Sequence, residues 1–323
     1  MERKIEFDIL KGILIIFVVT GHIGVNIGFD VYWFHMPAFF MISGYLTQKF
    51  ISLNDIKSLL INIRCHEKKI NKKYIQNKFK KFIIPYFTYC IIFYLIYRPE
   101  NILKNIARVL YAGGYNVTIY SFPYWFINAL MMGLLFYGTI RQYKYKILFL
   151  LAIYIIIHTQ IFHLLPILLP WGVDEGFGAL IFIALGDYIK GINLSDKRLY
   201  CIILLPIIFM LMVQGHIITY KLDMKSMWFN NYILDIIIPV SFTYLFFLIS
   251  KGIAKILYIK NLFLQLGLCS MTIYYTHAAF LWSYRELGIK NHLILTILII
   301  LTGICLHYIF RSNKKLSYLF LAK

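Results

Sequence analysis

Long apolar stretches recur along the chain, and short polar segments separate them. Each stretch is long enough, or nearly so, to cross about 30 Å of hydrocarbon as a helix. No fixed-period repeat, low-complexity tract or flexible linker divides the chain. The pattern predicts an all-α fold, a polytopic membrane bundle of about ten transmembrane helices in which residues 1–323 form one domain. The ten stretches are residues 9–28, 34–50, 82–97, 123–140, 146–165, 174–190, 199–218, 230–250, 264–284 and 292–310.

The longest polar segment, residues 51–81, has a helical pattern of its own. It predicts one or two amphipathic helices on the membrane surface, beginning at Asn54 or Asp55 as N-cap. The segment either anchors the protein only, or its end also binds an anionic group at the mouth of the third stretch. Its apolar positions are Ile56, Leu59, Leu60, Ile63, Ile70, Tyr74 and Phe79.

Composition and charge support a membrane protein with a defined orientation. Apolar residues make up 60% of the chain, against about 45–50% in soluble domains. The net charge is +19, and the Lys and Arg residues divide unequally between the two sides. If the N-terminus is cytoplasmic, 25 lie inside, seven lie outside, and Lys11 lies within the first stretch. This asymmetry predicts that both termini are cytoplasmic, and that the basic residues meet anionic lipid rather than nucleic acid.

Two other features limit the possibilities. The basic N-terminus resembles a signal peptide, but no small-residue cleavage site follows, so we expect the first stretch to be retained. The cysteines show neither metal-ligand spacing nor the even count of a disulfide framework, so we expect no bound metal. They are Cys65, Cys90, Cys201, Cys269 and Cys305.

The first stretch contains two ionisable residues. Lys11 and His22 are eleven residues apart, so they share a helix face and differ in depth by about 16 Å. An ionisable group near the bilayer centre costs about 2.5–3.5 kcal/mol or more, so this face indicates a polar interior. Lys11 either pairs with Asp8 or extends its ammonium to the membrane surface. His22 is either a hydrogen-bonded structural residue or a functional one.

Further candidates lie on other stretches. His35 begins the second stretch near the depth of His22, and is either interfacial or part of the same site. Ser43 with Gly44 is a small pair typical of helix packing. His277 follows an aromatic run and is either packing or a ligand. We expect His158, His163, His216 and His307 to be structural, and give Asp187 and Asp235 lower rank.

Taken together, several segments resemble the family-3 membrane acyltransferases, which O-acylate bacterial surface polysaccharides and related glycans. Lys11 and His22 match that family's Arg/Lys-x10-His signature. FHMPAFFMISGYL resembles its second-helix motif, in the form found in sugar O-acetylases of the fucose 4-O-acetylase type. NKFKKFIIPY, PYWFINAL and LGLCSMTIYYTHAAF are similar to its basic pair, its WF motif and its late Gly-Ser-Tyr-His element. Motifs of soluble enzymes, such as GxSxG, a P-loop or HExxH, are absent.

The resemblance implies an acetyl-CoA-dependent O-acetyltransferase of the bacterial cytoplasmic membrane. The donor would enter from the cytoplasm and meet Lys78 and Lys81, which stand where the family usually has two arginines. A lysine offers a point charge in place of the bidentate fork of an arginine. Lys11 would contact the donor below His22. His22 would be the general base, because an imidazole titrates near working pH, and His35 would orient the acceptor or assist proton transfer.

The acceptor implied by the resemblance is a hydroxyl of a cell-surface glycan, such as a capsule, or of a lipid-linked precursor. Its contacts would come from Ser43, Tyr124, Trp125, Asn128 and His277. The oligomeric state stays open. The residues also fit a transporter or flippase of lipid-linked glycans, although the repeated halves with broken helices common in transporters are not visible. A sensor or scaffold is a third reading, which would not require the Lys–His face.

Overall fold

The computed structural model describes residues 4–60, 72–97, 101–112, 121–164 and 169–323. Within these ranges all regular elements are helical, apart from an isolated antiparallel bridge between Asp223 and Trp228. The α-helices are α1 Ile5–Ile23, α2 His35–Leu46, α3 Leu53–Leu60, α4 Lys72–Tyr97, α5 Ile102–Tyr111, α6 Trp125–Ile140, α7 Lys146–His158, α8 Val173–Tyr188, α9 Leu204–Gln214, α10 Leu234–Ile253, α11 Leu257–Glu286, α12 His292–Ser312 and α13 Lys314–Leu316. Short 3-10 or π turns are η1 Val31–Trp33, η2 Phe122–Tyr124, η3 Ile161–Leu164, η4 Pro170–Gly172, η5 Ile189–Gly191, η6 Lys197–Ile203 and η7 Ser317–Leu321.

The all-α prediction is confirmed, and each of the ten predicted apolar stretches overlaps one of these helices. In the described part of the chain, four helical segments are both long and apolar enough to cross a membrane. They are α4, the continuous helical segment Lys197–Gln214, α10 and α12. Among the other stretches, α2 is a helix of only 12 residues, and α1 carries Glu6, Asp8 and Lys11. The 30-residue α11 is long enough, but polar residues such as Gln265 and Ser270 make it less apolar. A count of about ten spans therefore stays a prediction.

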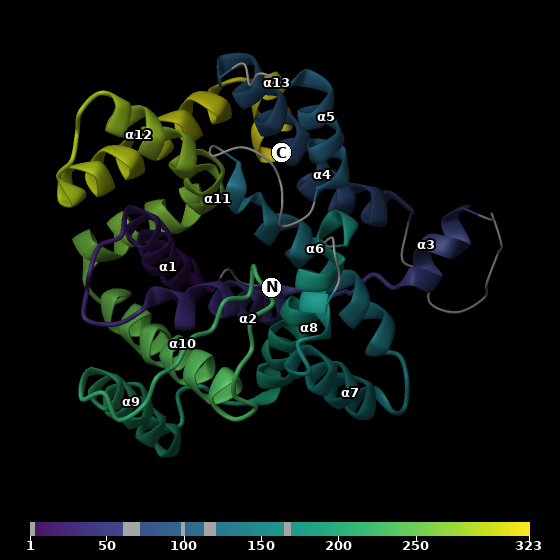
Figure 1. Ribbon diagram of the computed structural model, residues 1–323, viewed down its shortest axis with the longest axis vertical. Helices are drawn as coiled ribbons and strands as arrows, with labels where there is room; N and C mark the ends of the chain where they lie inside the picture. Colours follow the sequence, from purple (N-terminus) through teal and green to yellow (C-terminus); the bar gives the residue numbers. More distant parts are fainter. Residues whose placement is uncertain (1–3, 61–71, 98–100, 113–120, 165–168) are drawn as a thin grey trace.

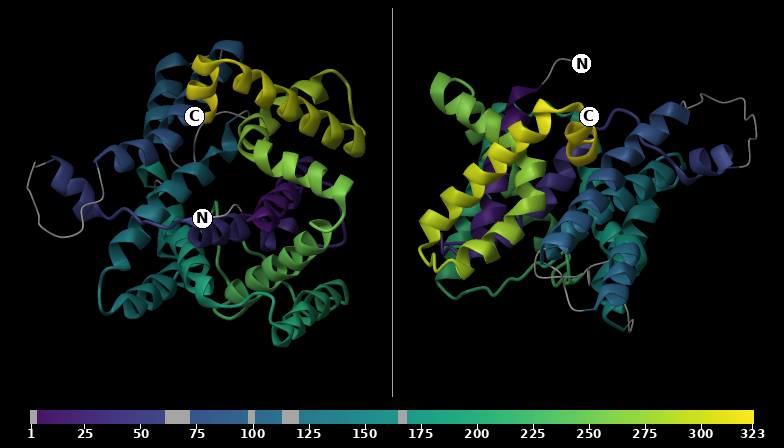
Figure 2. Two further views of the ribbon diagram at one scale, coloured as in Figure 1. Left: turned by 180° about the vertical axis from the view of Figure 1, so that it is seen from behind. Right: turned by 90° about the horizontal axis from the view of Figure 1, so that it is seen from above.

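The helix bundle has two opposite ends, which we call the terminal end and the loop end. Figure 2 (right) shows both chain termini at the terminal end and the segment joining α9 to α10, residues 215–233, at the loop end. Contacts agree with this arrangement: the Lys4 ammonium donates to the Tyr45 hydroxyl at 2.7 Å, and Lys190 donates to the Thr47 carbonyl at 2.6 Å. The segments predicted to be cytoplasmic thus gather at the terminal end.

α1 and α11 pack with their backbones in contact. A Cβ atom at Gly12 would collide with the Phe263 carbonyl, and one at Gly267 would collide with the Asp8 carbonyl. Small residues allow such close approach between membrane helices. Because the two helices run in the same direction, the residues near their loop ends also come together. In Figure 1, α1 lies between α11 above it and α10 below it, and α2 lies between this group and α6, α7 and α8.

α2 packs against α8 in a similar way. A Cβ atom at Gly44 would collide with the Ile183 carbonyl, and one at Gly186 with the Met41 carbonyl. The packing role expected for the Ser43–Gly44 pair is therefore seen at Gly44. Ser43 itself donates to the Phe39 carbonyl at 2.8 Å, one turn earlier on its own helix.

The polar segment 51–81 contributes to two helices. α3 covers its first part, α4 begins at Lys72, and the predicted positions Ile63 and Ile70 lie outside the described residues. The expected cap was wrong, because Ser52 occupies it. Its hydroxyl accepts from the Asp55 backbone at 3.2 Å, and the Asp55 carboxylate accepts from the Ser52 backbone at 2.8 Å. This reciprocal pair is a capping box, in which Asp55 stands at the third position of the helix.

Candidate functional site

The C-terminal turn of α1 carries His22 to the loop end. α1 stops at Gly24, whose φ of 86° lies in the left-handed region that favours glycine. The chain then turns back through residues 25–30 into η1, and Gly21 leaves room for the Val31 side chain. This return places the Tyr32 hydroxyl 3.2 Å from His22 Nδ1. The turn after α1 therefore provides a hydrogen-bond partner for one nitrogen of the His22 imidazole.

His22 lies in the wall of a cavity of about 330 Å³, which we call the loop-end cavity. Two imidazoles, several aromatic rings and four charged side chains surround it. Four separate parts of the chain contribute: the end of α1 with the start of α2, the η2–α6 junction, the segment 221–225 and α11. The lining residues are His22, Asp30, Tyr32, His35, Met36, Phe122, Pro123, Trp125, Lys221, Leu222, Asp223, Met224, Lys225 and Tyr274.

His35 is buried at the first position of α2 and also lines the loop-end cavity. Its Nδ1 lies 2.5 Å from the Val31 carbonyl. Because a carbonyl only accepts, Nδ1 carries a proton, and in the neutral imidazole Nε2 keeps its lone pair. The Tyr32 ring contacts the His35 ring edge-on, with 5.2 Å between centroids. The structure therefore brings the two predicted catalytic histidines to one cavity, and Tyr32 contacts both.

A third imidazole, that of His277, stacks on His22. The centroids are 5.0 Å apart and the planes differ by 25°. His277 Nδ1 donates to the Tyr274 carbonyl at 2.6 Å, so in the neutral imidazole Nε2 is the acceptor nitrogen. This Nε2 atom is buried and has no hydrogen-bond partner among the described groups. It is therefore an unused acceptor beside His22.

The predicted WF-motif residues form the aromatic side of the site. Trp125 lines the loop-end cavity, whereas Tyr124 is fully buried and donates to the Tyr275 carbonyl at 2.7 Å. Asn128 lies one turn further into α6 and donates to the Ala112 carbonyl at 2.8 Å. Tyr124 and Asn128 thus brace the element that presents Trp125.

Lys11 and Ser43 are predicted site residues that do not line this cavity. The Lys11 ammonium pairs with the Asp8 carboxylate at 2.6 Å, which is the pairing that their spacing allowed. Lys11 is only partly exposed and lies outside the wall of the loop-end cavity. Ser43 does not contribute to that wall either.

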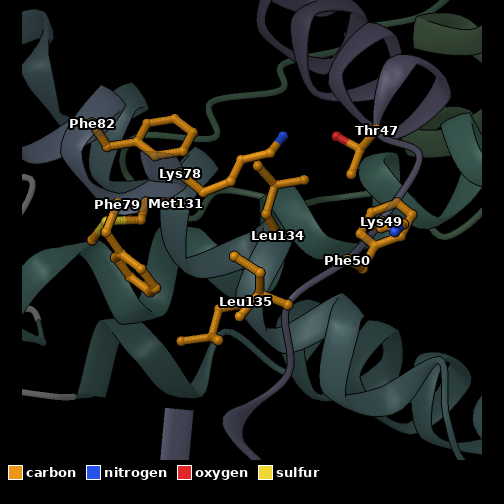
Figure 3. A pocket seen from close by; sticks show the side chains of 10 residues that line it. Thr47, Lys49, Phe50, Lys78, Phe79, Phe82, Met131, Leu134 and Leu135 are labelled. Carbon is orange, nitrogen blue, oxygen red and sulfur yellow. The ribbon is translucent and has the colours of Figure 1, made fainter. Parts of the chain in front are cut away.

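A smaller cavity, of about 40 Å³, lies at the terminal end (Figure 3). Lys78 crosses it from α4 with its ammonium toward Thr47, and Lys49 and Phe50 close the opposite side. Lys81 is exposed and lies outside this cavity wall. The predicted basic pair is therefore split, with only Lys78 in the terminal-end cavity.

A cluster of charged groups surrounds Phe50 beside this cavity. The Asp187 carboxylate accepts from Arg141 at 2.7 Å, from Lys190 at 2.6 Å and from the Tyr137 hydroxyl at 2.7 Å. Both cations also lie over the Phe50 ring, at 5.3 Å and 5.1 Å from its centroid. With Lys49 and Lys78 nearby, positive charge exceeds negative charge here.

Several loop-end cavity residues escaped the sequence-based reasoning. Tyr32 and Phe122 belong to no recognised motif. Lys221 and Lys225 were used only in the count of basic residues that predicts the membrane topology. Partial burial, reinforced by the nearby Asp30 and Asp223 carboxylates, raises the pKa of Tyr32 to about 12. Its hydroxyl therefore stays protonated at physiological pH. The one available signal was position, because each lies in a turn next to a predicted stretch.

Other ionisable residues have structural partners. His158 lies 3.1 Å from the Asp235 carboxylate, and His307 lies 2.9 Å from the Thr272 hydroxyl. The side chain of His163 is outside the described residues. Among the residues that the structure covers, no group of three or more His, Cys, Asp or Glu is placed to hold a metal ion.

Comparison with known proteins assigns a family to this arrangement. A family model described as an acyltransferase domain, that of acyltransferase family 3, matches residues 4–311. No curated protein and no solved structure matches the chain. The matched range includes α1 with His22, both cavities and α11 with His277. The chain is a membrane acyltransferase in general terms, and it belongs to acyltransferase family 3.

Proposed function

We propose that the protein transfers an acetyl group from acetyl-CoA to a hydroxyl of a cell-surface glycan or of its lipid-linked precursor. One observation carries the proposal: His22 lies in the wall of a cavity of about 330 Å³ that also presents His35, Trp125 and Tyr274. An imidazole suits a base at neutral pH, and aromatic faces pack well against sugar rings. The family fits acyl transfer better than transport.

In this proposal His22 accepts the proton of the acceptor hydroxyl. The Tyr32 hydroxyl engages Nδ1 at 3.2 Å, so Nε2 is the nitrogen available to the acceptor. The hydroxyl oxygen attacks the thioester carbonyl, a C–O bond forms, and the C–S bond then breaks. The proton held by His22 passes to the departing thiolate, which leaves as the free thiol of CoA. General-base catalysis of this kind contributes about 10²–10⁴ in rate.

The acetyl-CoA phosphates would lie at the terminal end. Lys78 and Lys49 line the cavity there, and Arg141 and Lys190 share one carboxylate beside it. Ammonium and guanidinium groups bind phosphates through charge-assisted hydrogen bonds. The pantetheine arm would then extend through the bundle toward His22. The terminal end would face the cytoplasm, where acetyl-CoA is made, and the enzyme would sit in the bacterial cytoplasmic membrane.

The acceptor would enter at the loop end. Trp125 and Tyr274 offer aromatic faces to a sugar ring, and His35 Nε2 can accept a hydrogen bond from a second hydroxyl. His277 Nε2 is a further acceptor, buried and unpaired among the described groups. Donor and acceptor thus approach His22 from opposite ends, so neither blocks the path of the other.

The test uses membranes from cells that express the chain, incubated with radiolabelled acetyl-CoA. Label is expected in the glycan with the native chain, and at a rate about 10²–10⁴ lower with His22→Gln. His216→Gln is the matched control, because His216 lies in an exposed turn beyond α9. Glycan labelling that survives His22→Gln would exclude this residue as the base. Movement of unmodified glycan without acetyl-CoA consumption would favour a transporter.

A further inference from the structure

The segment between α9 and α10 forms a turn at the loop end that is held by hydrogen bonds. Asp223 and Trp228 exchange backbone hydrogen bonds of 2.8 Å and 3.1 Å. The Asp223 carboxylate accepts from the Lys225 backbone at 3.0 Å and from the Ser226 hydroxyl at 2.9 Å. Figure 2 (right) shows this segment running across the end opposite the termini. The turn therefore has a defined shape.

Apolar side chains anchor this turn to the bundle. Leu222, Met224, Met227 and Phe229 are each 4% exposed or less. Residues 221–225 all line the loop-end cavity, so the anchoring fixes where their polar groups lie. The cavity wall thus includes a rigid element that carries Lys225.

Lys225 and His22 contact the same aromatic ring. The Lys225 ammonium lies 5.3 Å from the centroid of the Phe122 ring. The His22 ring meets Phe122 edge-on, with 4.9 Å between centroids. The Lys225 ammonium and the centre of the His22 ring are therefore at most about 10 Å apart, and both groups line the same cavity.

The Lys225 ammonium has no close counter-ion in the part of the chain that the structure describes. Among the described residues, no carboxylate lies within 4.0 Å of it. Two aspartates share the cavity wall, but Asp30 accepts from the Tyr32 backbone and Asp223 is used within its own turn. Partial burial lowers the pKa of Lys225, although Asp223 and Glu175 oppose the shift. An anion in the cavity would offset the cost of burying this charge.

We infer that the acceptor carries an anionic group, and that Lys225 binds it in the same cavity in which His22 meets the acetylated hydroxyl. The carboxylate of a uronic acid and a sugar phosphate share this chemistry. The inference rests on the proposed function, because it takes His22 as the place where the hydroxyl reacts. Lys221 adds a second positive charge to the same wall.

The test starts from the membrane assay with radiolabelled acetyl-CoA. The labelled glycan is released and applied to an anion-exchange column. We expect it to be retained at low salt and eluted by high salt. Alkaline phosphatase would abolish retention if the group is a terminal phosphate, and carbodiimide-activated reduction would abolish it if the group is a carboxylate. Label in a glycan that flows through unretained would overturn the inference.

Variants connect the charge to Lys225. Lys225→Gln should lower the initial rate of glycan labelling about tenfold or more, since a charge-assisted hydrogen bond is lost. Lys225→Arg should restore much of the rate, which a purely structural role for the lysine stem would not require. Lys290→Gln is the matched control, because Lys290 is an exposed loop-end lysine outside the cavity wall. An unchanged rate in Lys225→Gln would overturn the assignment.

The two proposals fail in different ways. Absence of label from every glycan would reject the acetyltransferase function and the inference with it. A labelled, His22-dependent and uncharged glycan would leave the function standing and reject only the anionic acceptor.

Discussion

The His22 and His277 rings lie face to face, although α1 and α11 are far apart in the sequence. Stacked rings do not hydrogen-bond to each other through their edges, so each imidazole depends on other partners. His22 has the Tyr32 hydroxyl, whereas His277 uses Nδ1 on the Tyr274 carbonyl, and its Nε2 has no partner among the described residues. The stack therefore holds an unused acceptor beside the proposed base.

This unused acceptor predicts the effect of His277→Leu. A buried polar atom without a partner costs about 1–3 kcal/mol, so the leucine variant should be as stable as the native protein or more so. If substrate engages Nε2, the same variant should label glycan about tenfold or more slowly. Thermal unfolding in detergent and the labelling rate measure the two effects. Normal labelling by a stable variant would show that His277 only packs.

Tyr32→Phe gives a prediction with a defined pH dependence. The phenol has a pKa of about 12, so its hydroxyl stays neutral from about pH 6 to about pH 10. Loss of one neutral hydrogen bond to His22 should slow labelling about two- to tenfold. The ratio of native to variant rate should be constant over this range. A ratio that changes steeply with pH would mean that the phenol ionises there.

The terminal-end cavity distinguishes the two lysines of the predicted basic pair. Lys78→Ala should raise the apparent KM for acetyl-CoA about three- to tenfold and leave kcat nearly unchanged, because it removes uniform binding. Lys81→Ala should change KM less than about twofold, since Lys81 is exposed beside the cavity rather than in its wall. Initial rates over a range of acetyl-CoA concentrations measure both. A fall in kcat alone for Lys78→Ala would contradict a role in donor binding.

Gly267→Ala tests the contact between α1 and α11. The added methyl would meet the Asp8 backbone carbonyl, which cannot move aside as a flexible side chain would. We expect a loss of about 1–3 kcal/mol in stability and reduced labelling, because the stacked imidazoles would separate. Gly252→Ala on α10 is the control, since a Cβ there meets nothing within 4 Å. Equal stability of the two variants would mean that the helices are less tightly packed.

The helices were predictable because a long apolar segment in a membrane must satisfy its own backbone hydrogen bonds, and a helix does so within one segment. The ion pair between Asp8 and Lys11 could also be predicted, since a spacing of three residues places both side chains on one helix face. His22 and His35 were expected near one depth, and both line the loop-end cavity. These features depend on local periodicity and on the order of spans.

Contacts between distant segments were not predictable. Nothing near Lys225 in the sequence indicates that Lys225 and His22 contact the same aromatic ring. That ring belongs to Phe122, which comes from a third segment of the chain. Lys78 and Lys81 looked equivalent until the fold gave them different surroundings. Such differences arise from packing between elements, which a one-dimensional pattern does not contain.

The pairing of α1 with α11 also governs when the enzyme becomes active during its synthesis. α1 leaves the ribosome first, but His22 has no stacking partner until α11, close to the end of the chain, has been inserted. The intervening helices must leave the face of α1 that carries Gly12 open for this late arrival. A nascent chain that lacks α11 would therefore leave this face of α1, and the His22 ring at its end, without the helix that covers them.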